Sequence, residues 1–224
     1  MNAEGIRGAA GTPEPHDSSR LHVAGRATYV DDIPEPRGLL HVAVGMSSVS
    51  HARIRSIDLT EVRHAPGVVA VITADDIAGD NNCGPVVPDD PILAPGLVQY
   101  IGQAVFAVAA VSVDDARRAA RRAVIEYDML EPVLDIRDAL AKQSFVLPSE
   151  TIRRGDSAGA IGRAIHRLEG SVNLGGQDQF YLEGHIAMAI PQEDGGILIY
   201  SSTQHPDEVQ SIVAHATQRE AKDI

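Results

Sequence analysis

The 224-residue sequence contains one cysteine, Cys83, and no tryptophan, and aromatic residues make up 4% of it. A single cysteine excludes an intrachain disulfide and a four-cysteine zinc or iron–sulfur site within this chain. Because aromatic residues are scarce, the core must consist mainly of valine, isoleucine, leucine and alanine. Cys83 has no obvious base partner close in sequence, so we interpret it as a small loop residue rather than a nucleophile.

Long apolar runs and a basic character are also missing. No apolar run reaches the roughly 18 residues that a membrane span requires. The formal net charge of −12 at pH 7 disfavours nucleic-acid binding, which needs clustered lysine and arginine. One local arginine cluster is interpreted as the solvated face of a helix: Arg117, Arg118, Arg121 and Arg122. The N-terminus has no basic region followed by an apolar stretch, so we expect no Sec signal and a cytoplasmic location.

Several motifs that carry chemistry are absent. The sequence has no glycine-rich phosphate loop and no nucleophile elbow around a serine. None of its nine histidines forms a pair with the spacing of a zinc-binding helix. Adjacent aspartates occur at four places, each beside a turn or helix start, where carboxylates bind backbone amides: residues 31–32, 75–76, 89–90 and 114–115.

Strand and helix patterns alternate along the first part of the sequence. Residues 1–19 have almost no large apolar side chains and are expected to form a disordered tail. Strands are expected at residues 39–46, 52–58, 68–73, 103–111 and 124–127, with helices from Thr60 and at residues 115–122. Ser112 or Asp114 is the expected N-cap of the second helix. This rhythm predicts an α/β fold with mixed sheets covered by helices, and we place this first domain at residues 20–135.

A second unit is expected after a linker at residues 136–149. Residues 150–224 contain patterns for a helix at 158–165, for strands at 168–174, 185–190 and 197–201, and for a final helix beginning near Pro206. Proline suits the first turn of a helix, and Asp207 and Glu208 suit its positive end.

Two short stretches of this unit could face a ligand. Gly175-Gly176 allows close backbone approach, although a β-bulge or tight turn is the simpler interpretation from local physics alone. At residues 201–206 a strand end meets a helix N-terminus, which offers free backbone N–H groups to an oxo or phosphate group. Gln204 adds a donor and an acceptor without charge, whereas ordinary helix capping by Ser202 or Thr203 is the simpler interpretation.

The sequence resembles the xanthine dehydrogenase and aldehyde oxidase family, and in particular the start of the molybdenum-binding large subunit of bacterial xanthine dehydrogenases. The resemblance begins with His22-Val-Ala-Gly-Arg-Ala-Thr-Tyr-Val-Asp-Asp-Ile33 and continues in the family's order through short segments up to Leu130-Glu-Pro132. It implies an a/b hammerhead domain followed by the truncated first part of a molybdopterin-binding domain.

Residues 175–183, Gly-Gly-Gln-Asp-Gln-Phe-Tyr-Leu-Glu, resemble the family's Gly-Gly-Gln-Glu-His-Phe-Tyr-Leu-Glu signature. Asp178 and Gln179 replace the glutamate and the histidine, so a role tied to the imidazole has no counterpart here. Ser202-Thr-Gln204 matches the family's Ser-Thr-Gln, whose glutamine hydrogen-bonds an oxo ligand of molybdenum. The resemblance assigns that role to Gln204, and it assigns no catalytic residue in this sequence.

The resemblance implies hydroxylation of hypoxanthine and xanthine to urate, with oxygen taken from water and NAD as the final acceptor. It implies a molybdenum–molybdopterin cofactor, with FAD and 2Fe-2S centres on a partner subunit. The family's glycine-rich segment after the last helix and its catalytic base are missing, so we expect the chain to need the C-terminal part of the large subunit and to be inactive alone.

Three alternatives remain open at this point. The chain could be a non-catalytic hammerhead module for assembly, or a fragment of another molybdenum hydroxylase acting on an aldehyde, carbon monoxide or a nitrogen heterocycle. An unrelated α/β hydrolase is a remote third alternative, because no nucleophile elbow is present.

Overall fold

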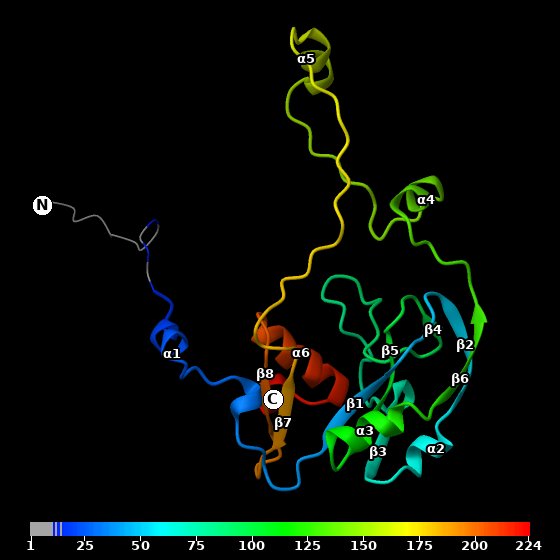
Figure 1. Cartoon of the computed structure of the whole chain (residues 1–224), viewed down its shortest axis with the longest axis vertical. Helices are drawn as coiled ribbons and strands as arrows, with labels where there is room; N and C mark the ends of the chain where they lie inside the picture. Colours follow the sequence, from blue (N-terminus) through cyan, green and yellow to red (C-terminus); the bar gives the residue numbers. More distant parts are fainter. Residues whose placement is uncertain (1–10, 12, 14) are drawn as a thin grey trace, which may run out of the picture.

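The computed structural model describes residues 11, 13 and 15–224, so most of the predicted N-terminal tail lies outside the described residues. Two short elements come first, the helix α1 (Ser19–Val23) and the 3-10 helix η1 (Val30–Asp32). They lead into a compact unit of two small sheets and then into a second, looser part (Figure 1). No helix in the described part of the chain is both long and apolar enough to cross a membrane.

The first sheet is built around a central strand. β5 (Ala104–Ala110) lies between β1 (His41–Met46) and β3 (Val68–Thr73), and both neighbours run antiparallel to it. The strand is made of alanine, valine and phenylalanine, which are among the residues most often fully buried. The short 3-10 helix η2 (Ala74–Asp76) follows β3.

The second sheet has the order β4-β2-β6. β2 (Ala52–Asp58) pairs antiparallel with the two-residue β4 (Leu97–Val98) and with β6 (Val124–Met129). The helix α2 (Thr60–Arg63) follows β2, and the proline-rich residues 80–95 form the irregular loop that precedes β4. The α/β class is therefore confirmed, and both of these sheets are antiparallel throughout.

The helix α3 (Val113–Ala120) packs on the first sheet through Ala116 and Ala119, which are both fully buried. Ser112 is its N-cap: the hydroxyl accepts a hydrogen bond from the Asp115 amide at 3.1 Å and donates one to the Asp115 carboxylate at 2.6 Å. This hydroxyl, with Arg118 at 2.8 Å, holds the pKa of Asp115 below its ordinary value. Of the two expected caps, Ser112 is confirmed and Asp114 is wrong.

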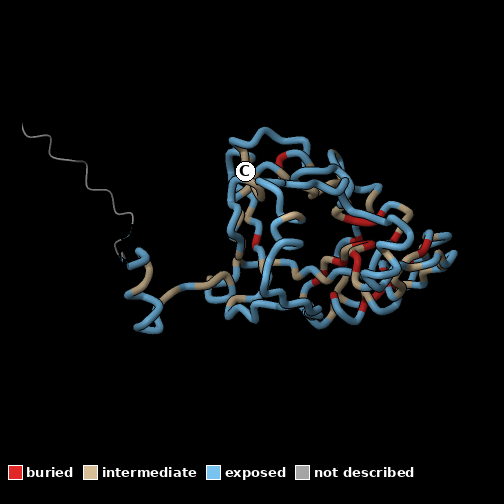
Figure 2. The backbone as a smooth tube through the Cα atoms, turned by 90° about the horizontal axis from the view of Figure 1, so that it is seen from above, coloured by how far each residue is buried: buried red, intermediate tan, exposed pale blue. Residues whose placement is uncertain are grey.

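The core lies almost entirely in this first unit. Among the described residues, every buried hydrophobic side chain falls within residues 52–119 except Met188 and Ala214. Phe106, 1% exposed, is the largest of them. Figure 2 shows this concentration, with buried segments gathered at one end of the molecule. The first unit therefore has its own core.

The chain then forms an arm with little internal structure. The helices α4 (Ile136–Ala141) and α5 (Ser157–Arg163) lie on it, and α5 is at its far end (Figure 1). The strand expected at residues 168–174 is wrong: residues 167–180 contain neither helix nor strand and are exposed. A strand needs a neighbour to accept its backbone hydrogen bonds, and the described chain places none beside this segment.

The chain ends in a hairpin and a helix. β7 (Ala187–Pro191) and β8 (Ile197–Ser201) pair antiparallel, α6 (Pro206–Thr217) follows, and the 3-10 helix η3 (Ala221–Asp223) closes the described chain. The C-terminus of α6 contacts the first unit, because the Gly79 and Asp80 amides donate to the carbonyls of Ala216 and His215 at 3.0 and 3.2 Å. A side chain at residue 79 would overlap the His215 carbonyl, so glycine is required at this contact.

We expect Gly45→Ala to destabilise the first unit by about 1–3 kcal/mol, because overpacking a filled core forces side chains out of their preferred positions. Gly45 lies opposite Phe106 in the β1–β5 register, and a Cβ there would overlap the aromatic ring. Urea unfolding followed by far-UV circular dichroism measures the change. The matched control is Gly96→Ala, whose added Cβ would have no neighbour within 4 Å. Equal destabilisation by both variants would contradict the packing described above.

Candidate functional site

The junction between β8 and α6 holds the Ser-Thr-Gln segment. β8 ends at Ser201 and α6 begins at Pro206, so residues 202–205 form the connecting bend. Gln204 lies in this bend, and its side chain is exposed. Its amide is therefore available to a ligand at the start of the helix.

Ser202 has an architectural role in this bend. Its hydroxyl accepts a hydrogen bond from the Ile186 amide at 3.0 Å and donates one to the Gly184 carbonyl at 2.9 Å. Its own amide donates to the Ile186 carbonyl at 3.0 Å. Ser202 thus joins the end of β8 to the chain that enters β7, and it does not cap α6.

Thr203 does not cap the helix either. Its hydroxyl accepts from the amide of His205 at 3.0 Å, and His205 is itself the N-cap position, without a side-chain capping bond. The capping interpretation of Ser202 and Thr203 is therefore wrong. The Asp207 and Glu208 amides in the first turn of α6 have no hydrogen-bond acceptor among the described residues.

The free backbone amides at the N-terminus of α6 and the side-chain amide of Gln204 both supply N–H donors. Together they can hydrogen-bond an oxo or phosphate group. The Asp207 and Glu208 carboxylates lie in the same turn and add negative charge. The described residues therefore provide hydrogen-bond donors for a polar part of a cofactor, but no positively charged side chain in this bend. Gln204 adds a side-chain donor and an acceptor without adding charge.

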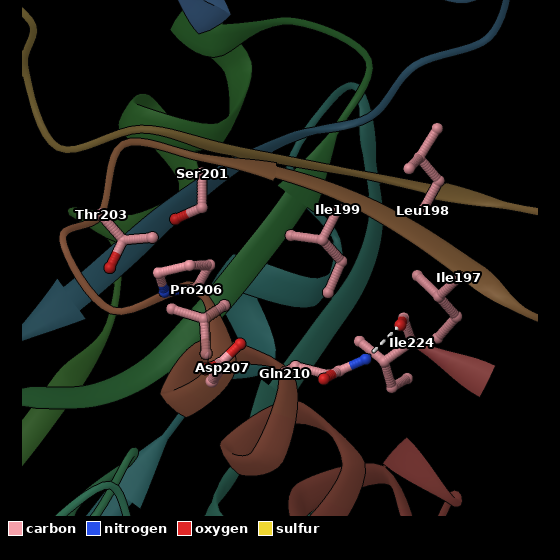
Figure 3. A pocket seen from close by; sticks show the side chains of 10 residues that line it. Ile197, Leu198, Ile199, Ser201, Thr203, Pro206, Asp207, Gln210 and Ile224 are labelled. Atoms are coloured by element: carbon pink, nitrogen blue, oxygen red, sulfur yellow. Dashed lines mark hydrogen bonds between the residues drawn. The ribbon is translucent and has the colours of Figure 1, made fainter. Parts of the chain in front are cut away.

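A cavity of about 310 Å³ lies between β8, α6 and the end of the chain (Figure 3). Apolar side chains form much of its lining, including Ile197, Ile199, Val209 and Ile224. Gln210 crosses one side, where its side-chain amide donates to the Ala221 carbonyl at 2.8 Å and to the Ile224 carbonyl at 2.9 Å. Thr203 and Asp207 also line the cavity, so its polar end lies at the bend that carries Gln204.

The glycine-rich signature at residues 175–183 lies on the exposed chain before β7. A Cβ added at Gly175 or Gly176 would meet nothing within 4 Å, so this structure gives neither glycine a packing role. Phe180 has a positive φ of 50° and its side chain is 98% exposed.

Glu183, the last residue of this signature, makes a contact that the sequence did not reveal. Its carboxylate accepts a hydrogen bond from the Val30 amide at 3.0 Å, across 153 residues of sequence. That amide belongs to the first turn of η1, where a carboxylate is favourable. This bond joins two segments that each resemble a family motif, residues 22–33 and residues 175–183. That resemblance is the only signal in the sequence that could have suggested the contact.

The remaining candidate residues have structural roles. Burial, followed by the nearby Asp90 charge, raises the pKa of the Cys83 thiol, which disfavours the reactive thiolate. Asp32 and Asp76 accept hydrogen bonds from the Tyr29 and Thr73 amides, as expected of aspartates at turns. No group of three or more His, Cys, Asp or Glu side chains in the described residues is placed to hold a metal ion.

Sequence comparison divides the chain into two matched regions. Residues 24–131 match the family model for the aldehyde oxidase and xanthine dehydrogenase a/b hammerhead domain, and residues 140–224 match that for the molybdopterin cofactor-binding domain. Xanthine dehydrogenase/oxidase of Gallus gallus is 35% identical over 94% of this chain, and aldehyde oxidase 2 of Rattus norvegicus is 40% identical over 94%. The chain spans 16% of the length of each of these relatives.

Solved structures share the same architecture. The aldehyde oxidoreductase of Desulfovibrio gigas matches with a TM-score of 0.78 and 26% identity, over 93% of this chain and 25% of its own. Quinoline 2-oxidoreductase of Pseudomonas putida 86 matches with a TM-score of 0.77 and 26% identity, over 92% of this chain and 28% of its own.

The two matched domains, a hammerhead domain followed by a molybdopterin cofactor-binding domain, are those of the molybdenum oxidoreductases. The two domain matches and the sequence relatives identify the same family within that class. The chain belongs to the xanthine dehydrogenase and aldehyde oxidase family.

We expect Ser202→Ala to loosen the entry into β7, because it leaves the Ile186 amide without its acceptor. The loss of such a bond costs about 1 kcal/mol, which corresponds to roughly fivefold faster hydrogen exchange of that amide. Exchange measured by NMR tests this. Gln204→Ala, in the same motif but exposed, serves as the control and is expected to leave the Ile186 amide unchanged. An unchanged hydrogen-exchange rate of the Ile186 amide in Ser202→Ala would contradict the architectural role of Ser202.

Proposed function

We propose that this chain forms the hammerhead domain and the first part of the molybdopterin-binding domain of a xanthine dehydrogenase. The reaction is the hydroxylation of hypoxanthine and xanthine to urate, with water as the oxygen source and NAD as the final acceptor. The observation that carries the proposal is the exposed Gln204 at the open N-terminus of α6. The xanthine dehydrogenases among its relatives support this choice of substrate.

In this proposal Gln204 would hydrogen-bond an oxo ligand of the molybdenum cofactor, and the free Asp207 and Glu208 amides would offer further donors to it. The bound molybdenum–molybdopterin supplies the hydroxylating chemistry. The chain itself positions the side-chain amide of Gln204 and leaves the N-terminus of α6 without a side-chain cap. Ser202 fixes the bend on which Gln204 lies.

The chain works with partners in this proposal. One is the C-terminal part of the large subunit, which supplies the catalytic base, and the other is a subunit carrying FAD and 2Fe-2S centres. We place the assembled enzyme in the cytoplasm, where its purine substrates are found. The short share of each relative that this chain spans, 15–16%, supports the need for further polypeptide.

A second candidate is the hydroxylation of an aldehyde. It is favoured by the 40% identity to an aldehyde oxidase and by the fold match to an aldehyde oxidoreductase. Assays of the assembled enzyme with xanthine, an aromatic aldehyde and quinoline separate the two candidates, since each predicts a different preferred substrate.

We expect the purified chain alone to reduce no NAD with xanthine, and the assembly with both partners to do so. In that assembly, Gln204→Ala is expected to lower kcat/KM at least about tenfold, the effect of losing one preorganised hydrogen bond to the reacting group. The control is Gln192→Ala, an exposed glutamine at the opposite end of the same hairpin. Turnover by the chain alone would overturn the requirement for partners, and equal rates for the two variants would overturn the role of Gln204.

A further inference from the structure

The helix α6 lies between the β7–β8 hairpin and the first unit, and its C-terminus hydrogen-bonds to that unit (Figure 1). The amides of Gly79 and Asp80 donate to carbonyls in the last turn of α6 at 3.0 and 3.2 Å. In the opposite direction, the side-chain amide of Gln218 donates to the Ala78 carbonyl. In the part of the chain that the structure describes, residues 184–224 make no other hydrogen bond to the first unit. The orientation of α6 against that unit therefore depends on this contact.

Gln218 has a backbone conformation that glutamine rarely adopts. It follows the last residue of α6 with φ 54° and ψ 41°, in the left-handed region. Its own amide and that of Arg219 close the helix by donating to the carbonyls of His215 and Ala214. Glycine is the usual residue at this position, because a Cβ disfavours a left-handed backbone. A glutamine here raises the free energy of the helix end, and the bond from its side chain to Ala78 offsets part of that cost.

Gln143 provides a comparison within the same chain. It follows the C-cap of α4 with a φ of 53°, so its backbone carries the same conformational cost. Its side chain is exposed and makes no hydrogen bond among the described residues. Of these two left-handed glutamines, only Gln218 has a side chain that binds another part of the fold. Both partners of that bond are exposed, so water competes for it and the expected effects are modest.

Arg219 connects the same helix end to the hairpin. Its guanidinium donates to the carbonyl of Gly195, which lies in the turn between β7 and β8. Gln218 and Arg219 therefore bind two different parts of the fold, the first unit and the hairpin. Because Ser202 fixes the other end of the hairpin, α6 and the hairpin are held together at both ends of the helix. They can thus move as one body against the first unit.

The orientation of α6 at its C-terminus determines where its N-terminus lies. The helix has 12 residues, so it is about 18 Å long at 1.5 Å for each residue. A tilt of about 5° at one end moves the other end by roughly 1.6 Å over that length. A displacement of about 1 Å is enough to weaken a catalytic arrangement. The contact at residues 78–80 therefore controls where Gln204, just before the helix, lies relative to the first unit.

We propose that Gln218 is a positioning residue, whose side-chain bond to Ala78 sets the orientation of α6 against the first unit and thereby the position of Gln204. A body that is held at two adjacent points can still turn about the line through them. The backbone bonds from Gly79 and Asp80 are two such points, and the bond from Gln218 stops the turn. The importance of this orientation for catalysis rests on the proposed function, whereas the orientation itself does not.

Residual dipolar couplings measured by NMR on the chain without cofactor test the orientation of α6. In the unchanged protein, the amides of α6 and of β5 are expected to fit one common alignment. Gln218→Glu keeps the shape of the side chain but replaces its donor by a carboxylate oxygen, which repels the Ala78 carbonyl. We expect the α6 couplings of this variant to depart from the β5 alignment. The Gly79 amide is expected to exchange at least about threefold faster, because its acceptor on α6 moves away.

Gln218→Gly and Gln143→Gly form a matched pair. Both relieve a left-handed backbone at a helix end, so each is expected to leave the protein folded. Gln218→Gly also removes the bond to Ala78, and its α6 couplings are expected to depart from the β5 alignment as in Gln218→Glu. Gln143→Gly is expected to keep the common alignment. Urea unfolding followed by far-UV circular dichroism measures stability separately, because a purely structural role would change stability and leave the alignment common.

A common alignment in both Gln218 variants would overturn the proposal. So would equal departures in Gln218→Gly and Gln143→Gly, since the effect would then not come from the bond to Ala78.

The assembled enzyme gives a second readout, which separates this proposal from the role of Gln204. Gln218→Glu is expected to lower kcat about threefold or more with KM nearly unchanged, because it displaces a group that acts on the reacting centre. Combined with Gln204→Ala, it is expected to add no further loss. If Gln204→Ala alone leaves the rate unchanged, the proposed function fails, and the dipolar couplings still decide the role of Gln218.

Discussion

The hammerhead unit depends on the pairing of one strand, β5, at both of its edges. Its neighbours β1 and β3 satisfy its backbone groups, while Phe106 and Val108 fill the core beneath α3. The burial of a strand costs little free energy when both of its edges are paired, because no backbone polar group is left without a partner. The second part of the chain has no such strand, because β7 and β8 pair only with each other among the described residues. Its contacts with the rest of the chain include the Glu183–Val30 hydrogen bond and the bonds of the Gly79 and Asp80 amides with the end of α6.

Local sequence patterns predicted the elements of the fold well. The bounds of β2, β3 and β8 agree with the expected strands, since alternating or continuous apolar residues lie between clear turn signals. The segment at residues 168–174 has a strand pattern too, but no neighbour satisfies its backbone groups. Pairing partners are distant in sequence, so local pattern alone could not distinguish these cases. The same limit applies to the division of the strands into separate antiparallel sheets.

The candidate site was only partly predictable. The position of Gln204 between a strand end and a helix start followed from the sequence, because Pro206 and the acidic residues after it indicate a helix N-terminus. The functions of the residues around it did not follow. Ser202 resembles a capping residue but binds the chain before β7, and Glu183 reaches an amide 153 residues away. Such contacts depend on the tertiary arrangement, which no local spacing encodes.

Pro191 limits how copies of this chain can associate. Two exposed β8 edges from different molecules can join into one four-stranded sheet, and this is the ordinary hazard of an open strand. The outer strands of that sheet would then be the two copies of β7, each with a proline where the next strand would need a hydrogen bond. Growth into a fibril requires every added chain to present another pairing edge. Pro191 therefore disfavours growth beyond a dimer at one end of β7, whereas Ala187 and Ala189 keep their backbone N–H groups. A newly made chain can thus expose an unpaired edge with a lower risk of starting an amyloid.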